Sequence, residues 1–431
     1  MSEQAFDFDD IQIEETDPQP KPERVRGTRR KRQVFPFLEL NLDVPLLLAV
    51  FVLLVFGALM VYSASADFSL VNYGDPTFMF FRQLMNIGIA LAAGLVASQL
   101  HYHFYRRYAV PMMALAAIAL LAVLVIGEVR YGSARALSGG SYMPGELAKV
   151  ITIIYLSVWL YSKRAELSKL TYGLGPLIGI VGVVAALIYM QPDISAAATI
   201  VIMGGILFFL AGGSLKQIAI ILVGSPVVIF LLTQVSLTAR TRVGDYLSGF
   251  QNLTQANDHV LRSYEAFVKG GWFGVGLGQA ETKLTGLPVP PTDSIFAVIG
   301  EELGLIGVLF VVLLFGFILW RGLTIARRAP DMFGSLLAAG LTLWISLEAF
   351  INMGVMVGLV PFAGNALPLI SYGGSSLLAT MIAFGILMNI AQVSRSQQQQ
   401  EERILDATAR GRRSERGWSL SRARRASRVV R

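Results

Sequence analysis

Residues 283–304, KLTGLPVPPTDSIFAVIGEELG, hold the densest group of side chains suited to chemistry. Prolines stiffen the approach to Asp293, and Thr292 and Asp293 are both residue types that favour the start of a helix. Glu301 and Glu302 follow inside an apolar run, where a carboxylate is costly unless it faces a polar cavity or a partner. These carboxylates are therefore candidates for a functional site. The competing structural interpretation is that Asp293 caps a helix and the glutamates face headgroups or neighbouring helices.

Three other short segments carry polar groups beside apolar runs. Glu146 and Lys149 stand three residues apart, so a helix there would place them on one face. Asp193 ends the short break QPD between two apolar runs, and Ser371 lies in the hydroxyl-rich stretch NALPLISYGGSS. Each segment also has a structural interpretation: an ion pair at a helix end, a proline turn, and a Gly–Ser helix start.

The elements that must position these groups are membrane helices. Hydrophobic residues make up 54% of the chain and charged residues only 15%, which excludes a set of soluble domains. Runs near the ~20-residue length that spans a bilayer predict an all-α membrane protein, a bundle of ten transmembrane helices. The predicted spans are 44–64, 79–98, 109–127, 145–162, 174–190, 193–211, 218–237, 295–319, 335–357 and 372–393.

Loop charges predict the orientation of these spans. One alternating set of loops carries basic residues such as Arg106, Lys163 and Arg327, whereas loop 65–78 has only acidic charges and loop 358–371 has none. By the positive-inside rule, the basic loops and both termini are cytoplasmic. The candidate groups named above then share the outer face of the membrane, which favours a common site.

The spans divide the chain into a membrane domain and two tails. Residues 1–43 form a cytoplasmic tail of mixed charge, residues 44–394 the membrane domain, and residues 395–431 an Arg-rich cytoplasmic tail. The Arg-rich tail suits anionic lipid headgroups, and we expect no nucleic-acid binding because no folded module accompanies the charge. The chain has no cysteine, which excludes disulfides. We expect no protein metal site.

Residues 238–294 form the long segment between the seventh and eighth predicted spans. We interpret it as a large extracytoplasmic loop, and loops of this length are usually functional. It contains Arg242, Lys283 and the glycine-rich stretch GGWFGVGLG at 270–278. That stretch is neither a P-loop nor a dinucleotide fingerprint, since no GK[ST] follows and no βαβ frame surrounds it. Glycine there favours tight turns or backbone that re-enters the membrane.

Six segments resemble the SEDS (shape, elongation, division and sporulation) proteins, which include FtsW and RodA. They are MVYSAS at 60–65, PGELAK at 144–149, QPD at 191–193, GGWFGVGLG at 270–278, PTDSIFAVIGEELG at 291–304 and LPLISYGGSS at 367–376. The resemblance covers residues 44–394 and implies a ten-helix membrane bundle with a large extracytoplasmic loop between helices 7 and 8. It also implies a peptidoglycan glycosyltransferase that polymerises lipid II at the outer face of the bacterial plasma membrane.

The sequences of the segments MVYSAS and LPLISYGGSS are more similar to the division member, FtsW, than to RodA. We therefore expect septal cell-wall synthesis, with elongation as the alternative. The resemblance further implies that the chain binds lipid II and undecaprenyl-pyrophosphate-linked glycan. A class B penicillin-binding protein transpeptidase and other division proteins are its implied protein partners.

The resemblance also assigns individual residues. Asp293 matches the acidic residue that the family needs for catalysis, and Lys283 matches the lysine after the glycine-rich stretch. Glu146 and Lys149 match the acidic and basic pair at the outer end of span four. The chain departs from the family's usual pattern at Ala136, at Met143–Gly145 and at Val289–Pro291.

The implied reaction makes a β-1,4 bond with inversion at a sugar that carries an α-linked pyrophosphate. A single displacement needs a base for the attacking 4-hydroxyl and positive charge for the leaving pyrophosphate. Asp293 is the candidate base, no cofactor is expected, and a divalent cation beside Asp293 is compatible with the chemistry. The candidate substrate-binding residues are Glu146, Lys149, Lys283, Arg242, Asp193 and Ser371.

Two functions from other classes remain open. A lipid II flippase would also need ionisable groups within a membrane domain. However, the sequence shows no internal repeat, and its polar groups gather on one face rather than at the midplane. A scaffold for division proteins would explain the basic tails but leaves the outer polar groups unexplained.

Overall fold

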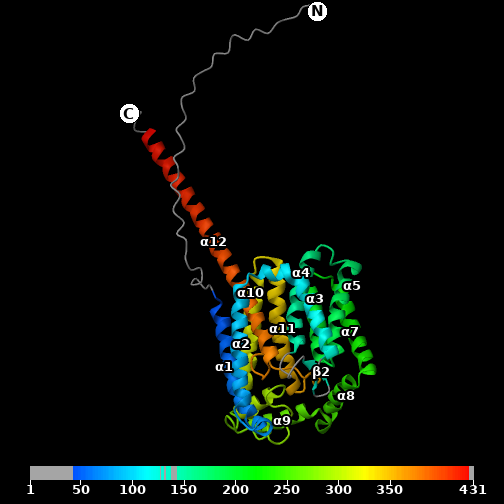
Figure 1. The fold of residues 1–431 in the computed structure, drawn as a ribbon. Coiled ribbons are helices and arrows are strands. Elements are labelled where there is room, and N and C mark those ends of the chain that lie inside the picture. The colour runs from blue at the N-terminus through cyan, green and yellow to red at the C-terminus, as the bar shows by residue number, and fades with distance from the viewer. Residues whose placement is uncertain (1–41, 127, 131–132, 137–142, 427–431) are drawn as a thin grey trace, which may run out of the picture. The chain divides into compact units, whose positions relative to one another are not determined.

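The computed structural model describes residues 42–126, 128–130, 133–136 and 143–426 of the chain (Figure 1). The expectation of an N-terminal tail at 1–43 therefore lies almost wholly outside the described residues, as do the last residues of the Arg-rich tail. Within the described part, helices dominate, and a short antiparallel hairpin of β1 (Glu128–Arg130) and β2 (Ser133–Ala136) lies between α3 and α4 in the sequence.

Every predicted span corresponds to a helix in the structure. The helices are α1 (Val44–Tyr73), α2 (Phe78–Gln99), α3 (Tyr102–Ile126), α4 (Pro144–Lys163), α5 (Gly175–Tyr189), α6 (Ile194–Leu210), α7 (Leu215–Val235), α10 (Ile295–Arg327), α11 (Met332–Met356) and α12 (Gly374–Ala426). A short π-helical turn, Leu170–Leu174, precedes α5. The first and last spans are longer than predicted, because α1 continues to the left-handed cap at Gly74 and α12 continues to Ala426.

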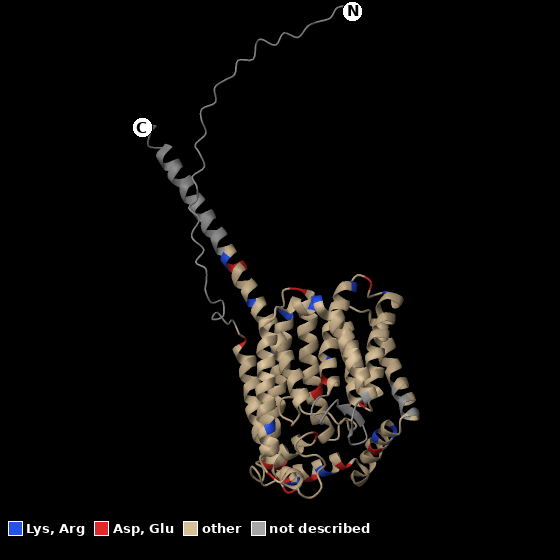
Figure 2. Ribbon diagram, viewed as in Figure 1, with Lys and Arg blue, Asp and Glu red and all other residues tan. Residues whose placement is uncertain are grey.

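The all-α, multi-pass membrane class is confirmed. Among the described residues, 7 helices are long and apolar enough to cross a membrane, and two shorter apolar helices lie at Ile194–Leu210 and Leu215–Ser225. Helix α4 is absent from this set, and it carries Glu146, Lys149 and Lys163. The count of ten spans therefore stays a prediction. Figure 2 shows Lys, Arg, Asp and Glu mostly at the two ends of the bundle.

The segment 238–294, predicted to be a large extracytoplasmic loop, is partly helical in the structure, and its orientation stays a prediction. Two helices, α8 (Leu237–Gln251) and α9 (Asp258–Gly270), lie there with a 3₁₀ turn, Leu253–Gln255, between them. In Figure 1 they lie across the lower end of the bundle, where α1 ends and α2 begins. Polar side chains start both helices: Ser236 accepts a hydrogen bond from the Ala239 amide at 3.3 Å, and Asn257 from the His259 amide at 3.1 Å.

Small residues bring α2 and α12 into close contact. A Cβ atom on Gly385 would lie 2.2 Å from the Gly94 carbonyl oxygen, so the two helices could not approach as closely with a larger residue at position 385.

At the start of α1, Asp43 caps the helix and binds two arginines from distant segments. Its carboxylate accepts from Arg321 of α10 at 2.8 Å and from Arg395 of α12 at 2.7 Å. This cluster joins α1, α10 and α12.

Candidate functional site

Helix α10 is interrupted by a kink at Gly304, where φ is +66° and ψ is −164°. A kink leaves backbone groups without their helical partners, and buried groups of this kind need replacements. The glycine-rich segment supplies them: the Val275 amide donates to the Glu301 carbonyl at 2.9 Å, and the Leu305 amide donates to the Gly271 carbonyl at 2.9 Å. The segment and the kinked helix thus complete each other's hydrogen bonding.

Glycine is required at the contact between these two segments. Gly274 has φ +79°, and a Cβ atom there would lie 2.1 Å from the Glu302 carbonyl oxygen. A Cβ atom on Gly304 would likewise lie 2.5 Å from the Gly274 nitrogen. The prediction of tight turns at 270–278 is confirmed by positive φ angles at Gly271, Gly274, Gly276 and Gly278.

The two glutamates that precede the kink are fully buried and have specific partners. Glu301 accepts from the Glu281 amide at 2.9 Å and from the hydroxyl and amide of Thr282. Glu302 accepts from the Ser63 hydroxyl of α1 at 2.6 Å. The expectation that these carboxylates face partners is confirmed, and contact with headgroups is excluded by their burial.

Lys283 lies within the same network. Its ammonium donates to the Glu302 carboxylate at 3.2 Å, to the Ser63 carbonyl at 3.1 Å and to the Gly278 carbonyl at 3.0 Å. An ammonium has three donors, and these contacts use all of them. Lys283 therefore joins α1, the glycine-rich segment and α10, and its contact with a pyrophosphate stays a prediction.

Asp293 lies just before α10 and does not occupy the cap position. The cap residue is Ser294, and its side chain makes no cap bond, so the helix-capping interpretation does not account for Asp293. The carboxylate points towards the last outer segment: a Cβ atom on Gly364 would lie 3.6 Å from Asp293 Oδ2. Glycine is required at position 364, where φ is +66°.

Backbone hydrogen bonds fix the segment that carries Asp293. Asn352 of α11 donates from Nδ2 to the Asp293 carbonyl at 2.9 Å and to the Asn365 carbonyl at 2.6 Å. Ser371 donates its hydroxyl to the Thr292 carbonyl at 2.6 Å. Ser371 therefore positions the backbone beside Asp293, and its direct contact with substrate stays a prediction.

His259 of α9 is a site residue that the sequence analysis missed. Its Nδ1 lies 2.7 Å from the Ser294 hydroxyl, next to Asp293, and its ring stacks on Phe362 with centroids 4.1 Å apart. Burial lowers the pKa of His259 to about 4; Asp258 opposes this shift, and Arg242 adds to it. The imidazole is therefore neutral at neutral pH. The sequence did not indicate His259 as a site residue, because a single histidine in a polar segment matches no catalytic or metal-binding motif.

Arg242 of α8 also contacts the Phe362 ring. Its guanidinium lies 5.4 Å from the Phe362 ring centroid and donates to the Ala363 carbonyl at 3.4 Å. Arg242, His259 and Asp293 thus gather around residues 362–364. A cation, aromatic rings and a carboxylate are therefore close together at this point of the structure.

Lys149 lies between two carboxylates in the interior of the bundle. It is 4% exposed and donates to Glu146 at 3.0 Å and to Glu348 of α11. The predicted pair of Glu146 and Lys149 is confirmed. Glu348 was missed, although a single carboxylate in the otherwise apolar α11 is a signal for a functional or paired group.

Helix α11 connects this pair to the segment of Asp293. Glu348 binds Lys149, and Asn352, four residues further along the same helix face, binds the Asp293 carbonyl. One turn of α11 therefore contacts both Lys149 and the backbone of Asp293, which lie far apart in the sequence.

Asp193 has a structural role in α6. Its carboxylate accepts from the Ala196 amide at 3.1 Å and from the Ser195 hydroxyl at 3.0 Å. Helix capping accounts for these contacts, and substrate binding by Asp193 stays a prediction. Among the described residues, no group of three or more His, Cys, Asp or Glu side chains is arranged to hold a metal ion.

Residues 44–396 match the family of FtsW, RodA and SpoVE, described as cell cycle proteins. The chain belongs to this family. A probable peptidoglycan glycosyltransferase FtsW of Trichlorobacter lovleyi is 37% identical over 365 residues, which cover 83% of this chain and 94% of that protein. The stage V sporulation protein E of Bacillus subtilis is 34% identical over 358 residues, or 82% and 98% of the two chains. The SEDS resemblance is thus confirmed.

Solved structures support the same fold. A chain from a peptidoglycan synthase complex that coordinates polymerisation and crosslinking superposes with a TM-score of 0.68 at 23% identity. The rod shape determining protein RodA of Thermus thermophilus superposes with a TM-score of 0.61 at 23% identity. Each comparison covers 82% of this chain and 98% of the other. At this identity, the likeness establishes the fold.

Proposed function

We propose that this chain is a peptidoglycan glycosyltransferase that polymerises lipid II into glycan strands. The observation that carries the proposal is the arrangement around α11, where Glu348 binds Lys149 and Asn352 binds the backbone of Asp293. A carboxylate and a cation are held together by one rigid element, as a displacement reaction requires. The names of the FtsW relatives support the same activity.

In this reaction, Asp293 acts as the general base. It takes the proton of the attacking sugar 4-hydroxyl as the new β-1,4 bond forms and the bond from the anomeric carbon to the pyrophosphate breaks. The configuration inverts, because a single displacement has no second carboxylate as nucleophile. Arg242 and Lys149 are the candidates to stabilise the negative charge that develops on the pyrophosphate. A cofactor is not required for this chemistry, and a divalent cation beside the pyrophosphate would be compatible with it.

The charges of the loops support the proposed location, and the relatives support the proposed partners. The protein lies in the bacterial plasma membrane with both termini cytoplasmic and the site of Asp293 outside. A class B penicillin-binding protein transpeptidase is the expected partner, and the solved synthase complex supports such an association. The FtsW relatives favour septal synthesis during division, together with other division proteins; elongation is the alternative.

The test is polymerisation of pure lipid II by the purified protein in liposomes, with and without a transpeptidase partner. We expect Asp293→Asn to reduce the rate about 10²–10⁴-fold while lipid II still binds. The exposed Asp67 of α1 gives a matched control, since Asp67→Asn should leave the rate unchanged. Normal polymerisation by Asp293→Asn would refute the role of Asp293. Wild-type protein that moves lipid II across the bilayer without linking it would instead be a flippase.

A further inference from the structure

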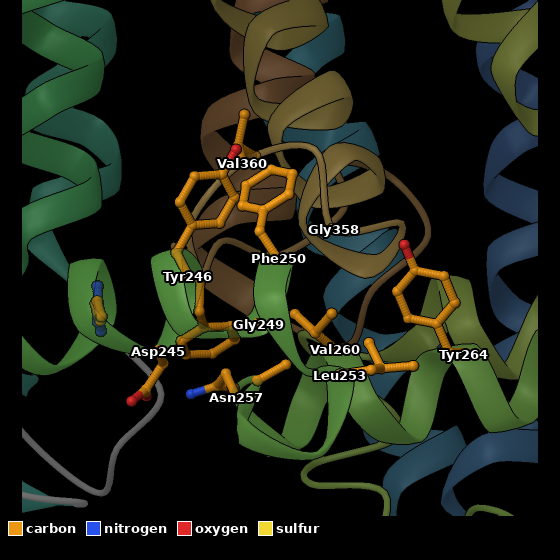
Figure 3. A pocket seen from close by; sticks show the side chains of 13 residues that line it. Asp245, Tyr246, Gly249, Phe250, Leu253, Asn257, Val260, Tyr264, Gly358 and Val360 are labelled. Atoms are coloured by element: carbon orange, nitrogen blue, oxygen red, sulfur yellow. The ribbon is translucent and has the colours of Figure 1, made fainter.

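A cleft opens beside the site, between α8, α9 and residues 358–362 (Figure 3). It encloses about 90 Å³, where one water needs about 10–15 Å³, so it is large enough to admit part of a ligand. We call it the outer cleft. The side chains used below are Asp245, Tyr246, Phe250, Asn257, Tyr264 and Phe362, all of which line it.

The outer cleft adjoins the carboxylate of Asp293. Phe362 forms the wall between them: a Cβ atom on Gly364 would lie 3.7 Å from the Phe362 ring and 3.6 Å from Asp293 Oδ2. The ring and the carboxylate therefore border the same small space. A strand that reacts at Asp293 would therefore reach the cleft by passing the Phe362 ring.

The aromatic side chains of the cleft are held in fixed positions. Tyr246 donates its hydroxyl to the Leu359 carbonyl at 2.9 Å, and Tyr264 donates to the Val357 carbonyl at 2.9 Å. Figure 3 shows these two tyrosines on opposite sides of the cleft. Phe250 is 70% exposed, so a large part of this side chain remains available to a ligand.

Polar groups lie among these rings. Asp245 supplies carboxylate oxygens, and Asn257, whose Oδ1 caps α9, also carries an NH₂ group of the kind that can donate hydrogen bonds. A sugar needs this combination, because its C–H face packs on aromatic rings while its hydroxyl and acetamido groups need acceptors and donors. An isoprenoid chain would bury the carboxylate without a partner. Among the described lining residues, Arg242 is the one cation, and the proposed function assigns it to the leaving pyrophosphate. The rest of the cleft, with Asp245, therefore suits an uncharged sugar.

We propose that the outer cleft binds a sugar of the growing glycan strand that lies beyond the disaccharide reacting at Asp293. The inference rests on the proposed polymerase function, since a polymer of sugars is what would extend from the site. Such a subsite retains the strand between successive additions. It therefore sets the length of the strands more than the rate of the first coupling.

The test compares product length and first coupling in two cleft variants, Phe250→Ala and Asp245→Asn. Loss of one aromatic contact weakens binding about 2- to 10-fold, so we expect strands shortened by a similar factor and an unchanged rate of joining two lipid II molecules. Leu247→Ala is the matched control, because Leu247 is exposed on the same helix and lies outside the cleft.

A direct binding measurement separates this inference from the proposed function. The probe is the β-1,4-linked tetramer of N-acetylglucosamine, observed by saturation-transfer NMR with the purified full chain. Contact with wild type and Leu247→Ala that weakens about 2- to 10-fold in Phe250→Ala supports the subsite, even if no lipid II is polymerised. Wild-type strand length and undiminished probe contact in both cleft variants would overturn it while leaving the polymerase intact. Equal shortening by Leu247→Ala would also overturn it.

Discussion

Lys149 of α4 and Glu348 of α11 form a buried ion pair that joins two helices through the interior of the bundle. Glu146 contributes a second carboxylate to the same ammonium, with its side chain 19% exposed. Removing the charge of Lys149 would leave two carboxylates without their cation. The lysine thus has a structural role whether or not it also contacts a pyrophosphate.

We expect Lys149→Met to destabilise the protein by about 3–5 kcal/mol, because breaking a buried pair leaves an uncompensated charge. The double variant Lys149→Met with Glu348→Gln should recover most of this loss, since the deeper carboxylate is then neutral. Thermal unfolding in detergent measures both effects. If the double variant is stable and polymerises lipid II normally, Lys149 has no part in catalysis.

Gly274 and Gly278 provide a matched pair for the contact at the kink of α10. Both have positive φ, +79° and +80°, so alanine suffers similar backbone strain at either position. Only at Gly274 would the added Cβ atom meet backbone, at 2.1 Å from the Glu302 oxygen, whereas nothing lies within 4 Å at Gly278. We expect Gly274→Ala to lower the unfolding temperature much further than Gly278→Ala. Equal effects would mean that the contact does not stabilise the kink.

His259 predicts a dependence of stability on pH. Its pKa in the folded protein is about 4, below the ordinary value of 6.5, so the unfolded chain takes up the proton first as the pH falls. The stability gained from the neutral ring is complete above pH 6.5 and is lost as the pH falls towards 4. We expect the unfolding temperature to drop between pH 7.5 and 5.5, and to drop less in His259→Phe. Identical profiles would show that His259 does not titrate in this way.

The orientation of the chain can be tested with single cysteines, because the native chain has none. The exposed positions Asn72 and Gln251 belong to the predicted outer face, and Ser168 and Gln398 to the cytoplasmic face. We expect Asn72→Cys and Gln251→Cys to react with an impermeant maleimide in intact cells, and the other two to react only after lysis. Labelling of Ser168→Cys in intact cells would reverse the assigned topology.

The helices of the bundle were predictable because a long apolar run has few alternatives to a membrane helix. Helices α8 and α9 were not, because their polar composition resembles a loop, and α9 has regular apolar positions such as Val260 and Ala266 only over a short length. The partners of polar groups also escaped prediction. Lys149 and Glu348 are 199 residues apart, and the hydrogen bond from Ser63 to Glu302 spans 239 residues. Such pairings depend on helix packing, which the order of residues does not reveal.

The kink at Gly304 has a consequence for how the protein responds to its bilayer. The glycine-rich segment is bonded to both sides of the kink, through the Glu301 carbonyl before Gly304 and the Leu305 amide after it, whereas the later turns of α10 must match the hydrocarbon thickness. We expect these bonds to hold the kink and the neighbouring segment of Asp293 in place when the tilt of the later turns changes. We therefore expect polymerisation rates to vary little between liposomes of short and long acyl chains, and to vary more in Gly304→Ala. Asp293, the candidate base, would then keep its position in membranes of different thickness.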